Sequence, residues 1–144
     1  MRDRRVVTAL RVLLGVLTVS ATTVGVWAAF APRSFYDDFP GLGQIWVAVD
    51  GPYNEHLVRD VGSLNLALAV VSLCALITLV RSTVVASALA WLVYGVPHFV
   101  YHARHLAPFD GTESVAVLAS VGSTSVVALL VLWLDRDRRG ARVS

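Results

Sequence analysis

The amino-acid sequence predicts an all-α protein, a transmembrane four-helix bundle with a long outer loop between its first two helices, in a single domain over residues 1–144. Composition is the first reason: 56% of the residues are hydrophobic and 15% are charged, whereas a soluble domain is usually about a quarter charged. The second reason is that four apolar stretches are each long enough to cross a hydrocarbon core, which takes about 20 helical residues. The third is an uneven distribution of arginine, which fits segments on alternating sides of a membrane.

The four apolar stretches define the helices that we expect. Within lipid, every backbone amide needs a hydrogen-bond partner inside the protein, so these stretches must be helical. The predicted helices cover residues 6–31, 52–80, 82–106 and 114–134, and the outer loop covers residues 32–51.

The first stretch also has features of a secretory signal peptide. Arg2, Arg4 and Arg5 precede an apolar run that ends in Ala29-Phe30-Ala31, an A-x-A cleavage pattern. The apolar run has about 20 residues, whereas a signal peptide usually has about 7–15. We therefore expect a retained first transmembrane helix, with cleavage as the alternative.

The arginines predict the orientation in the membrane. All 12 basic residues are arginine. Nine of them lie on the side of both termini, with three acidic residues, and the other side carries three arginines and seven acidic residues. The positive-inside rule then places both termini in the cytoplasm, which predicts a multi-pass protein of the inner (plasma) membrane. The lack of lysine and the abundance of Ala and Val are associated with bacteria of high GC content.

The outer loop is long and aromatic. It contains Phe35, Tyr36, Phe39 and Trp46, and Pro40 with two nearby glycines interrupts any regular helix. Because Trp and Tyr rings favour the membrane surface, we expect the loop to be an interfacial anchor. A structured lid over the mouth of the bundle is the alternative.

The second helix is expected to begin near Pro52, with Asp50 or Gly51 as its cap. At 100° per residue, a polar strip then lies on one face of its outer end, and Asn65 lies on the opposite side. The strip contains two i,i+4 pairs of opposite polarity, Glu55–Arg59 and His56–Asp60. A solvated, ion-paired helix entrance is one interpretation of this strip, and part of a binding site is the other.

The third helix carries three of the four histidines. His98, His102 and His105 fall at i, i+4 and i+7 on one face, which Tyr94 and Tyr101 share. Pro97 removes a backbone hydrogen bond, so we expect a kink just before the histidines.

The histidines predict a candidate metal site. We expect His98, His102 and His56 to meet at the outer mouth of the bundle, with His105, Glu55 and Asp60 nearby, because lipid-facing polar strips are costly. Neutral imidazole suits zinc, copper or iron, and a haem with a histidine axial ligand is the related option. A proton relay and a purely structural role are the other interpretations.

One layout within the chain resembles a known group of proteins. A first helix that ends in Pro32-x-x-Phe35 is followed by a glycine-containing loop and then by Asn54-Glu55, Arg59 and Gly62. This layout resembles the DoxX-like and DUF4345-like small four-helix membrane proteins of bacteria. The resemblance implies the fold, and some members are linked to membrane-associated redox complexes. Arg59 stands further from the Asn-Glu pair than in that pattern, and the histidine strip is not part of it.

Function is predicted at the level of class. A net charge of +2 and arginines at the chain ends argue against a nucleic-acid partner. Cys74 is the only cysteine, which excludes an intramolecular disulfide and a CxxC pair. No nucleotide motif or nucleophile elbow suggests an enzyme, and no catalytic residue is assigned. The first hypothesis is an accessory or structural subunit whose polar cluster docks a membrane-protein partner or a second copy. The alternative is a metal- or haem-binding protein in outer-face redox or metal handling.

Overall fold

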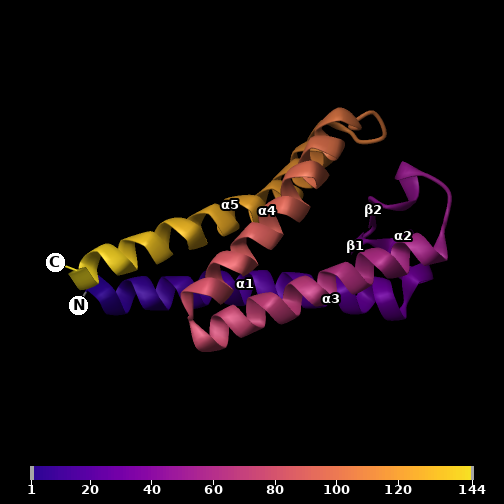
Figure 1. The fold of residues 1–144 in the computed structure, drawn as a ribbon. Helices are drawn as coiled ribbons and strands as arrows, with labels where there is room; N and C mark the ends of the chain where they lie inside the picture. The colour runs from indigo at the N-terminus through magenta and orange to yellow at the C-terminus, as the bar shows by residue number, and fades with distance from the viewer. Residues whose placement is uncertain (1, 144) are drawn as a thin grey trace.

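A computed structural model describes the backbone of residues 2–143 and the side chains of residues 4–138. Four long helices dominate the described chain, and the predicted all-helical class is confirmed. The elements are α1 (Arg2–Phe30), α2 (Pro32–Asp38), β1 (Pro40–Gly41), β2 (Gln44–Ile45), the 3₁₀ turn η1 (Ala48–Asp50), α3 (Glu55–Thr78), α4 (Arg81–Arg104) and α5 (Gly111–Val143) (Figure 1).

None of the four long helices begins at the residue that the sequence patterns suggested, and the starts of α3 and α5 have local causes. The helix α3 begins at Glu55 because the Asn54 side chain accepts a hydrogen bond from the backbone N–H of Leu57, at 3.1 Å. The helix α5 begins three residues before the expected position, at Gly111. Asp110 accepts from the N–H of Glu113, and the Glu113 side chain accepts from the N–H of Asp110. This reciprocal capping box fixes the first turn of α5.

The four long helices have the length and composition of membrane spans. In the described part of the chain, these spans are Arg4–Phe30, Glu55–Thr78, Arg81–Arg104 and Gly111–Arg138. Large apolar side chains such as Val19, Ile77 and Val93 lie exposed on the outside of these helices. Exposed apolar surface on this scale is typical of protein that lipid or a partner covers.

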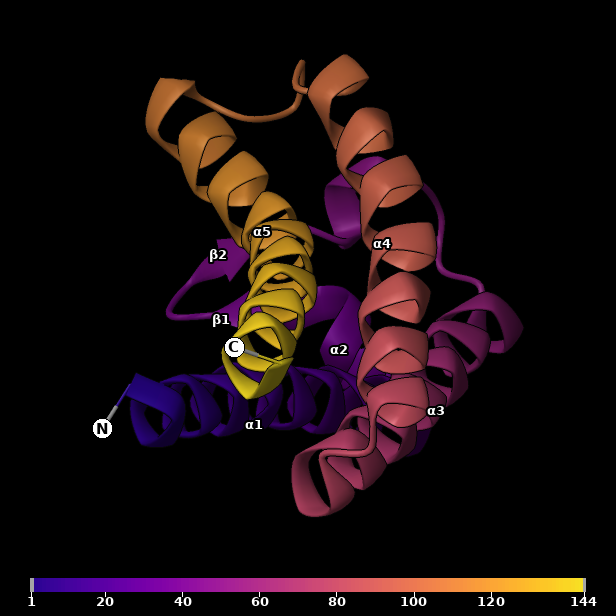
Figure 2. The same cartoon turned by 60° about the vertical axis from the view of Figure 1, so that its left-hand side comes forward.

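The helices associate as two pairs that diverge. The helix α1 packs along α3, and α4 packs along α5. The two chain termini lie at one end of the molecule, which we call the terminal end, and the pairs spread apart towards the opposite end (Figures 1 and 2). The segment from α2 to η1 lies at that opposite end, which we call the lid end.

The main core joins all four helices. Its fully buried side chains include Leu10, Leu14, Val84 and Val131. Within it, the Trp91 indole N–H donates to Ser72 at 2.9 Å, and Ser72 and Ser87 share a hydrogen bond of 3.1 Å. These polar groups are buried but paired, which avoids the penalty of an unmet hydrogen bond.

Two glycines allow α1 and α3 to pack closely. A Cβ atom at Gly62 would lie 2.4 Å from the backbone nitrogen of Ala29, and one at Gly25 would lie 2.9 Å from the backbone nitrogen of Leu66. Helix backbones can approach this closely only where one residue lacks a side chain.

An ion pair lies in the core at the terminal end. The Arg138 guanidinium bonds the carboxylate of Asp135, and their side chains are 9% and 1% exposed. Arg138 also donates two hydrogen bonds, of 3.1 and 3.2 Å, to the carbonyl of Leu79. Leu79 has a φ of 50°, the left-handed conformation that ends α3. Arg138 therefore fastens α5 to the turn between α3 and α4.

The helix α4 continues without a break through Pro97. The ring of Pro97 is exposed, whereas Gly95 is buried against α5, where a Cβ atom would lie 2.5 Å from the hydroxyl oxygen of Ser125. The kink predicted at Pro97 stays a prediction.

Candidate functional site

The expected outer loop is a folded unit. Residues 32–50, which we call the lid, contain α2, a two-residue antiparallel hairpin and η1. Gly41, Leu42 and Gly43 form the hairpin turn with positive φ angles of 99°, 59° and 79°. Glycine adopts this conformation without a steric cost, and the Leu42 side chain between them is fully exposed. Pro40 and the glycines do interrupt a helix, as expected, but only after α2 has formed.

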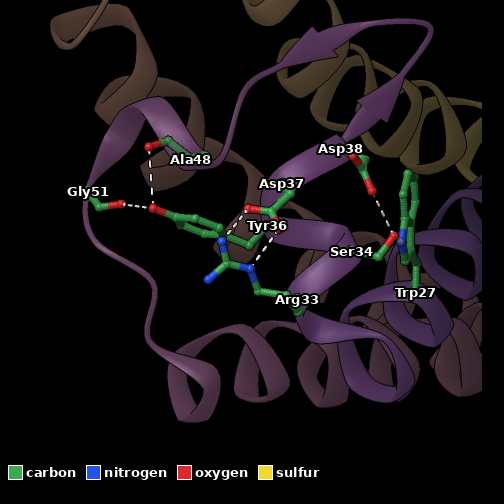
Figure 3. A network of polar contacts seen from close by, with 8 residues as sticks. All are labelled: Trp27, Arg33, Ser34, Tyr36, Asp37, Asp38, Ala48 and Gly51. Atoms are coloured by element: carbon green, nitrogen blue, oxygen red, sulfur yellow. Dashed lines mark hydrogen bonds and ion pairs between the residues drawn. The ribbon is translucent and has the colours of Figure 1, made fainter.

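Side-chain hydrogen bonds hold the lid in shape (Figure 3). Arg33 makes two hydrogen bonds to Asp37, of 2.6 and 3.0 Å, and its hydrogen bond to that carboxylate, followed by the carboxylate charge, raises the pKa of Arg33. The Tyr36 hydroxyl donates to the carbonyl of Gly51 across the lid. Trp27 of α1 donates to Ser34, at 3.2 Å, so the first turn of α2 is also fixed to α1.

The underside of the lid is apolar. Trp27, Phe35, Phe39 and Trp46 form a continuous series of ring contacts, with centroid separations of 5.8, 4.7 and 6.2 Å. Phe35 is buried in a second small core together with Ala28 of α1 and Val58 of α3. The aromatic residues of the loop therefore pack against the helices, as the alternative of a structured lid requires, and the interfacial anchor stays a prediction.

A cavity of about 300 Å³ lies beneath the lid, where the two helix pairs diverge. All four long helices line it, and Phe35, Phe39, Trp46, Val47 and Asp50 close it on the lid side. The lining residues on α4 run from Trp91 to His102, which is roughly 16 Å of helix at 1.5 Å per residue. The cavity is therefore elongated along the helices.

The lining is mostly apolar but has a polar strip along α4. Tyr94, His98 and His102 follow one another along this helix, and each of the two histidines contacts the ring before it. The Asn65 amide of α3 donates to the Tyr94 hydroxyl at 3.4 Å. Few polar groups in a mostly apolar cavity are the usual composition of a small-molecule site.

Two polar atoms of the cavity lining are buried without a partner. They are the indole nitrogen Nε1 of Trp46, on the lid, and the ring nitrogen Nδ1 of His102, on α4; neither has a hydrogen-bond partner among the described residues. A buried donor or acceptor without a partner costs about 1–3 kcal/mol. Both atoms are covered by surrounding protein atoms, so neither faces the open space of the cavity.

The expected meeting of His56 with His98 and His102 is not what the structure shows. The His56 side chain is 88% exposed and lies 3.3 Å from Asp60, which is 61% exposed. The reason is the direction of α3: its buried face carries Val58, Gly62 and Asn65, whereas His56 and Asp60 lie on an exposed face.

The other residues of the polar strip on α3 have local structural roles. Arg59 bonds Glu55 at 2.8 Å, and its guanidinium also donates to the carbonyl of Ala29, near the C-terminal end of α1. A cation at this end of a helix satisfies a free carbonyl and opposes the helix dipole. Arg59 therefore joins α3 to the end of α1.

His105 is separated from the cavity. Its ring nitrogen Nδ1 lies 2.7 Å from the carbonyl of Tyr101, at the C-terminal end of α4, and its ring stacks on Tyr101 at 4.1 Å. The Tyr101 hydroxyl donates to Asp50 of the lid at 3.1 Å. Tyr101 thus fastens the lid to α4.

The predicted metal site has no assembled ligand set. In the part of the chain whose side chains are described, no group of three or more His, Cys, Asp and Glu residues is placed to hold a metal ion. The haem option stays a prediction. His98 and His102 are the only two of the four histidines that line the cavity.

Sequence patterns missed three residues of this site: Asn65, Trp46 and Asp50. Asn65 carried a usable signal, since it is a polar residue within an apolar span and such residues tend to face the protein interior. Trp46 and Asp50 carried none, because their place depends on how the lid folds.

No protein-family model, curated protein or solved structure matches this chain significantly. The resemblance to the DoxX-like group therefore stays a prediction.

Proposed function

We propose that this chain is an integral membrane protein that binds a small, mostly apolar molecule in the cavity beneath the lid. The cavity itself carries the proposal. It is of the size at which small-molecule sites begin, about 300 Å³, and it combines an apolar lining with a few polar groups. The exposed apolar side chains of the four helices support insertion into a bilayer.

The arginine distribution supports the orientation. With both termini in the cytoplasm, the terminal end carries nine of the 12 arginines, and the lid faces outward from the inner membrane. A ligand would then be taken from the outer leaflet or from the space beyond it. Docking of a protein partner on the exposed face of His56 and Asp60 remains the other prediction.

Bromine quenching of tryptophan fluorescence tests the proposal. The chain has four tryptophans, and only Trp46 and Trp91 line the cavity. We would substitute Trp27→Phe and Trp133→Phe, place the protein in lipid nanodiscs, and titrate para-bromophenol. Binding in the cavity should quench the two remaining tryptophans saturably, because a bound bromine contacts them directly.

The control separates binding from partitioning into lipid. N-acetyl-tryptophan octyl ester in the same nanodiscs should show quenching that rises linearly with the probe. The Val121→Phe substitution, which fills the cavity from α5, should convert the protein signal to the same linear form. Linear quenching of the unfilled protein would refute the proposed function.

A further inference from the structure

We propose that the ligand of this cavity is a single unbranched hydrocarbon chain, taken from the bilayer leaflet at the lid end. This inference rests on the proposed function and adds the chemical class of the ligand and its source. Three features of the cavity support it: its shape, its apolar walls and its exposed edges.

The cavity is long and narrow. Its lining runs from Leu57 to Asn65 on α3 and from Trp91 to His102 on α4, which is roughly 12 and 16 Å of helix at 1.5 Å per residue. Over this length its volume is only about 300 Å³, the space of about ten water molecules. The free space therefore extends along the helices and is small across them.

A hydrocarbon chain fits this shape. A methylene group takes up nearly the volume of a water molecule, so the cavity holds about ten of them. An extended chain advances about 1.2 Å per bond, as an extended polypeptide does, so ten methylene groups span roughly 12 Å. One chain therefore matches the volume and the length together, whereas a compact ring of equal volume is wider than the space.

The walls suit a chain because they are mostly apolar. Val24 of α1, Val61 of α3 and Val121 of α5 line the cavity from three sides. The polar strip on α4 is partly engaged within the protein: the Tyr94 hydroxyl accepts from the Asn65 amide, and the His98 ring stacks on Tyr94 at 5.4 Å. The valine walls would contact the methylene groups of a chain.

Filling the cavity with a chain restores packing at little cost. An empty space leaves the atoms of its lining without contacts on one side. A chain that moves from the bilayer into the cavity loses no contact with water, since lipid is as apolar as the valine walls. Water is a poorer occupant, because each buried molecule needs about 2–4 polar partners.

The cavity is exposed at its sides. Leu57 on α3 and Ser120 on α5 both line it and are exposed, Leu57 by 60%. The helices α3 and α4 diverge from the turn that joins them (Figures 1 and 2), and Leu64 continues the exposed apolar face of α3 beyond Leu57. The lid covers the remaining end and is held to α4 by the hydrogen bond from Tyr101 to Asp50. A chain can therefore enter sideways from the leaflet.

Two alcohols of ten carbons each test the shape. In nanodiscs, the Trp27→Phe, Trp133→Phe protein should be quenched saturably by ω-bromodecanol, a chain with bromine on its last carbon. Unbrominated decanol and cyclodecanol then compete with this probe. After correction for partitioning, decanol should displace it at an at least about tenfold lower concentration, because overfilling a cavity with a wide ring costs about this factor or more.

A brominated phospholipid tests the source of the chain. Trp91 is 1% exposed, so lipid around the outside of the protein does not contact it. In nanodiscs of dibromostearoyl phosphatidylcholine, entry of a phospholipid chain should make tryptophan emission weaker in the unfilled protein than in Val121→Phe, where the cavity is filled. Equal emission of the two proteins, with saturable quenching by ω-bromodecanol, would assign the chain to free single-chain amphiphiles of the leaflet.

The outcomes separate this inference from the proposed function. Equal displacement by decanol and cyclodecanol would overturn the inference, because the cavity would not select a chain. Linear quenching by ω-bromodecanol would overturn it as well. In either case, saturable quenching by para-bromophenol would leave the proposed function standing. Linear quenching by both brominated probes would overturn the proposed function and the inference together.

Discussion

The terminal end and the lid end are built from the same four helices, yet they differ in how completely the space between the helices is filled. At the terminal end, Leu10, Leu14 and Val131 are fully buried, and the buried pair of Asp135 and Arg138 is hydrogen bonded. At the lid end, the helix pairs diverge around a cavity of about 300 Å³, and two buried polar atoms have no partner among the described residues.

The difference suggests that the two ends of the helices have different roles. Close packing provides most of the stability of a helix assembly in lipid, where there is no hydrophobic force between helices. A cavity gives up part of that packing, since its lining lacks contacts on one side. The close packing of the terminal end therefore compensates for the incomplete packing of the lid end, which leaves room for the binding site that we propose.

The largest expected effect tests the terminal end. Arg138→Ala should lower the free energy of unfolding by about 3 kcal/mol or more, because it removes one member of a buried ion pair. It also removes two hydrogen bonds to the turn between α3 and α4. Unfolding in a detergent titration would measure the loss.

Arg136→Ala is the matched control for this prediction. Arg136 is exposed and lies within the same turn of α5, so its substitution should change the free energy of unfolding by less than about 0.5 kcal/mol. Equal effects of the two substitutions would mean that the buried pair does not stabilise the terminal end.

The long helices were predictable from the sequence, since an apolar stretch of about 20 residues crosses lipid as a helix. Their ends were less predictable, because the caps at Asn54 and Asp110 depend on short local patterns that compete with Pro52 and Ser114. The capping box of Asp110 and Glu113 was present in the sequence and could have been used.

The candidate site was only half predictable. The spacing of His98 and His102 placed them on one face of α4, and the structure brings both to the cavity. For α3, the charged strip around His56 suggested an inward face, but the close approach at Gly62 turns the face of Val58, Gly62 and Asn65 inward instead. A glycine contact between helices depends on the partner helix, which the sequence of α3 alone does not specify.

The prediction with an intermediate effect on the free energy of unfolding compares the two ends of the molecule through two residues of α5. Val131 is fully buried at the terminal end, whereas Val121 lines the cavity. Val131→Phe should cost about 1–3 kcal/mol, the usual effect of overpacking. Val121→Phe should cost less than about 1 kcal/mol, since its ring enters existing space, and it should abolish saturable quenching by para-bromophenol.

The same unfolding titration would measure both valine variants. The comparison between the two ends would be broken if Val121→Phe proved as costly as Val131→Phe, because the space beneath the lid would then not be available to a ring of that size.

The prediction with the smallest expected effect concerns the hydrogen bond that fastens the lid. Tyr101 joins the lid to α4 through its hydrogen bond to Asp50, and the loss of one partly exposed hydrogen bond costs about 0.5–1.5 kcal/mol. Tyr101→Phe should therefore accelerate hydrogen exchange of the lid amides severalfold, including the Trp46 amide, which donates to the Phe39 carbonyl at 2.8 Å. Amides at the terminal end should not change, since opening of the lid breaks none of the contacts there.

Tyr36→Phe is the control: the Tyr36 hydroxyl bonds Gly51 within the same segment, so its loss should affect exchange around Gly51 and leave the Trp46 amide protected. If Tyr101→Phe accelerated exchange equally at both ends, lid opening and unfolding of the helices would be one event, and the two ends would not be independent.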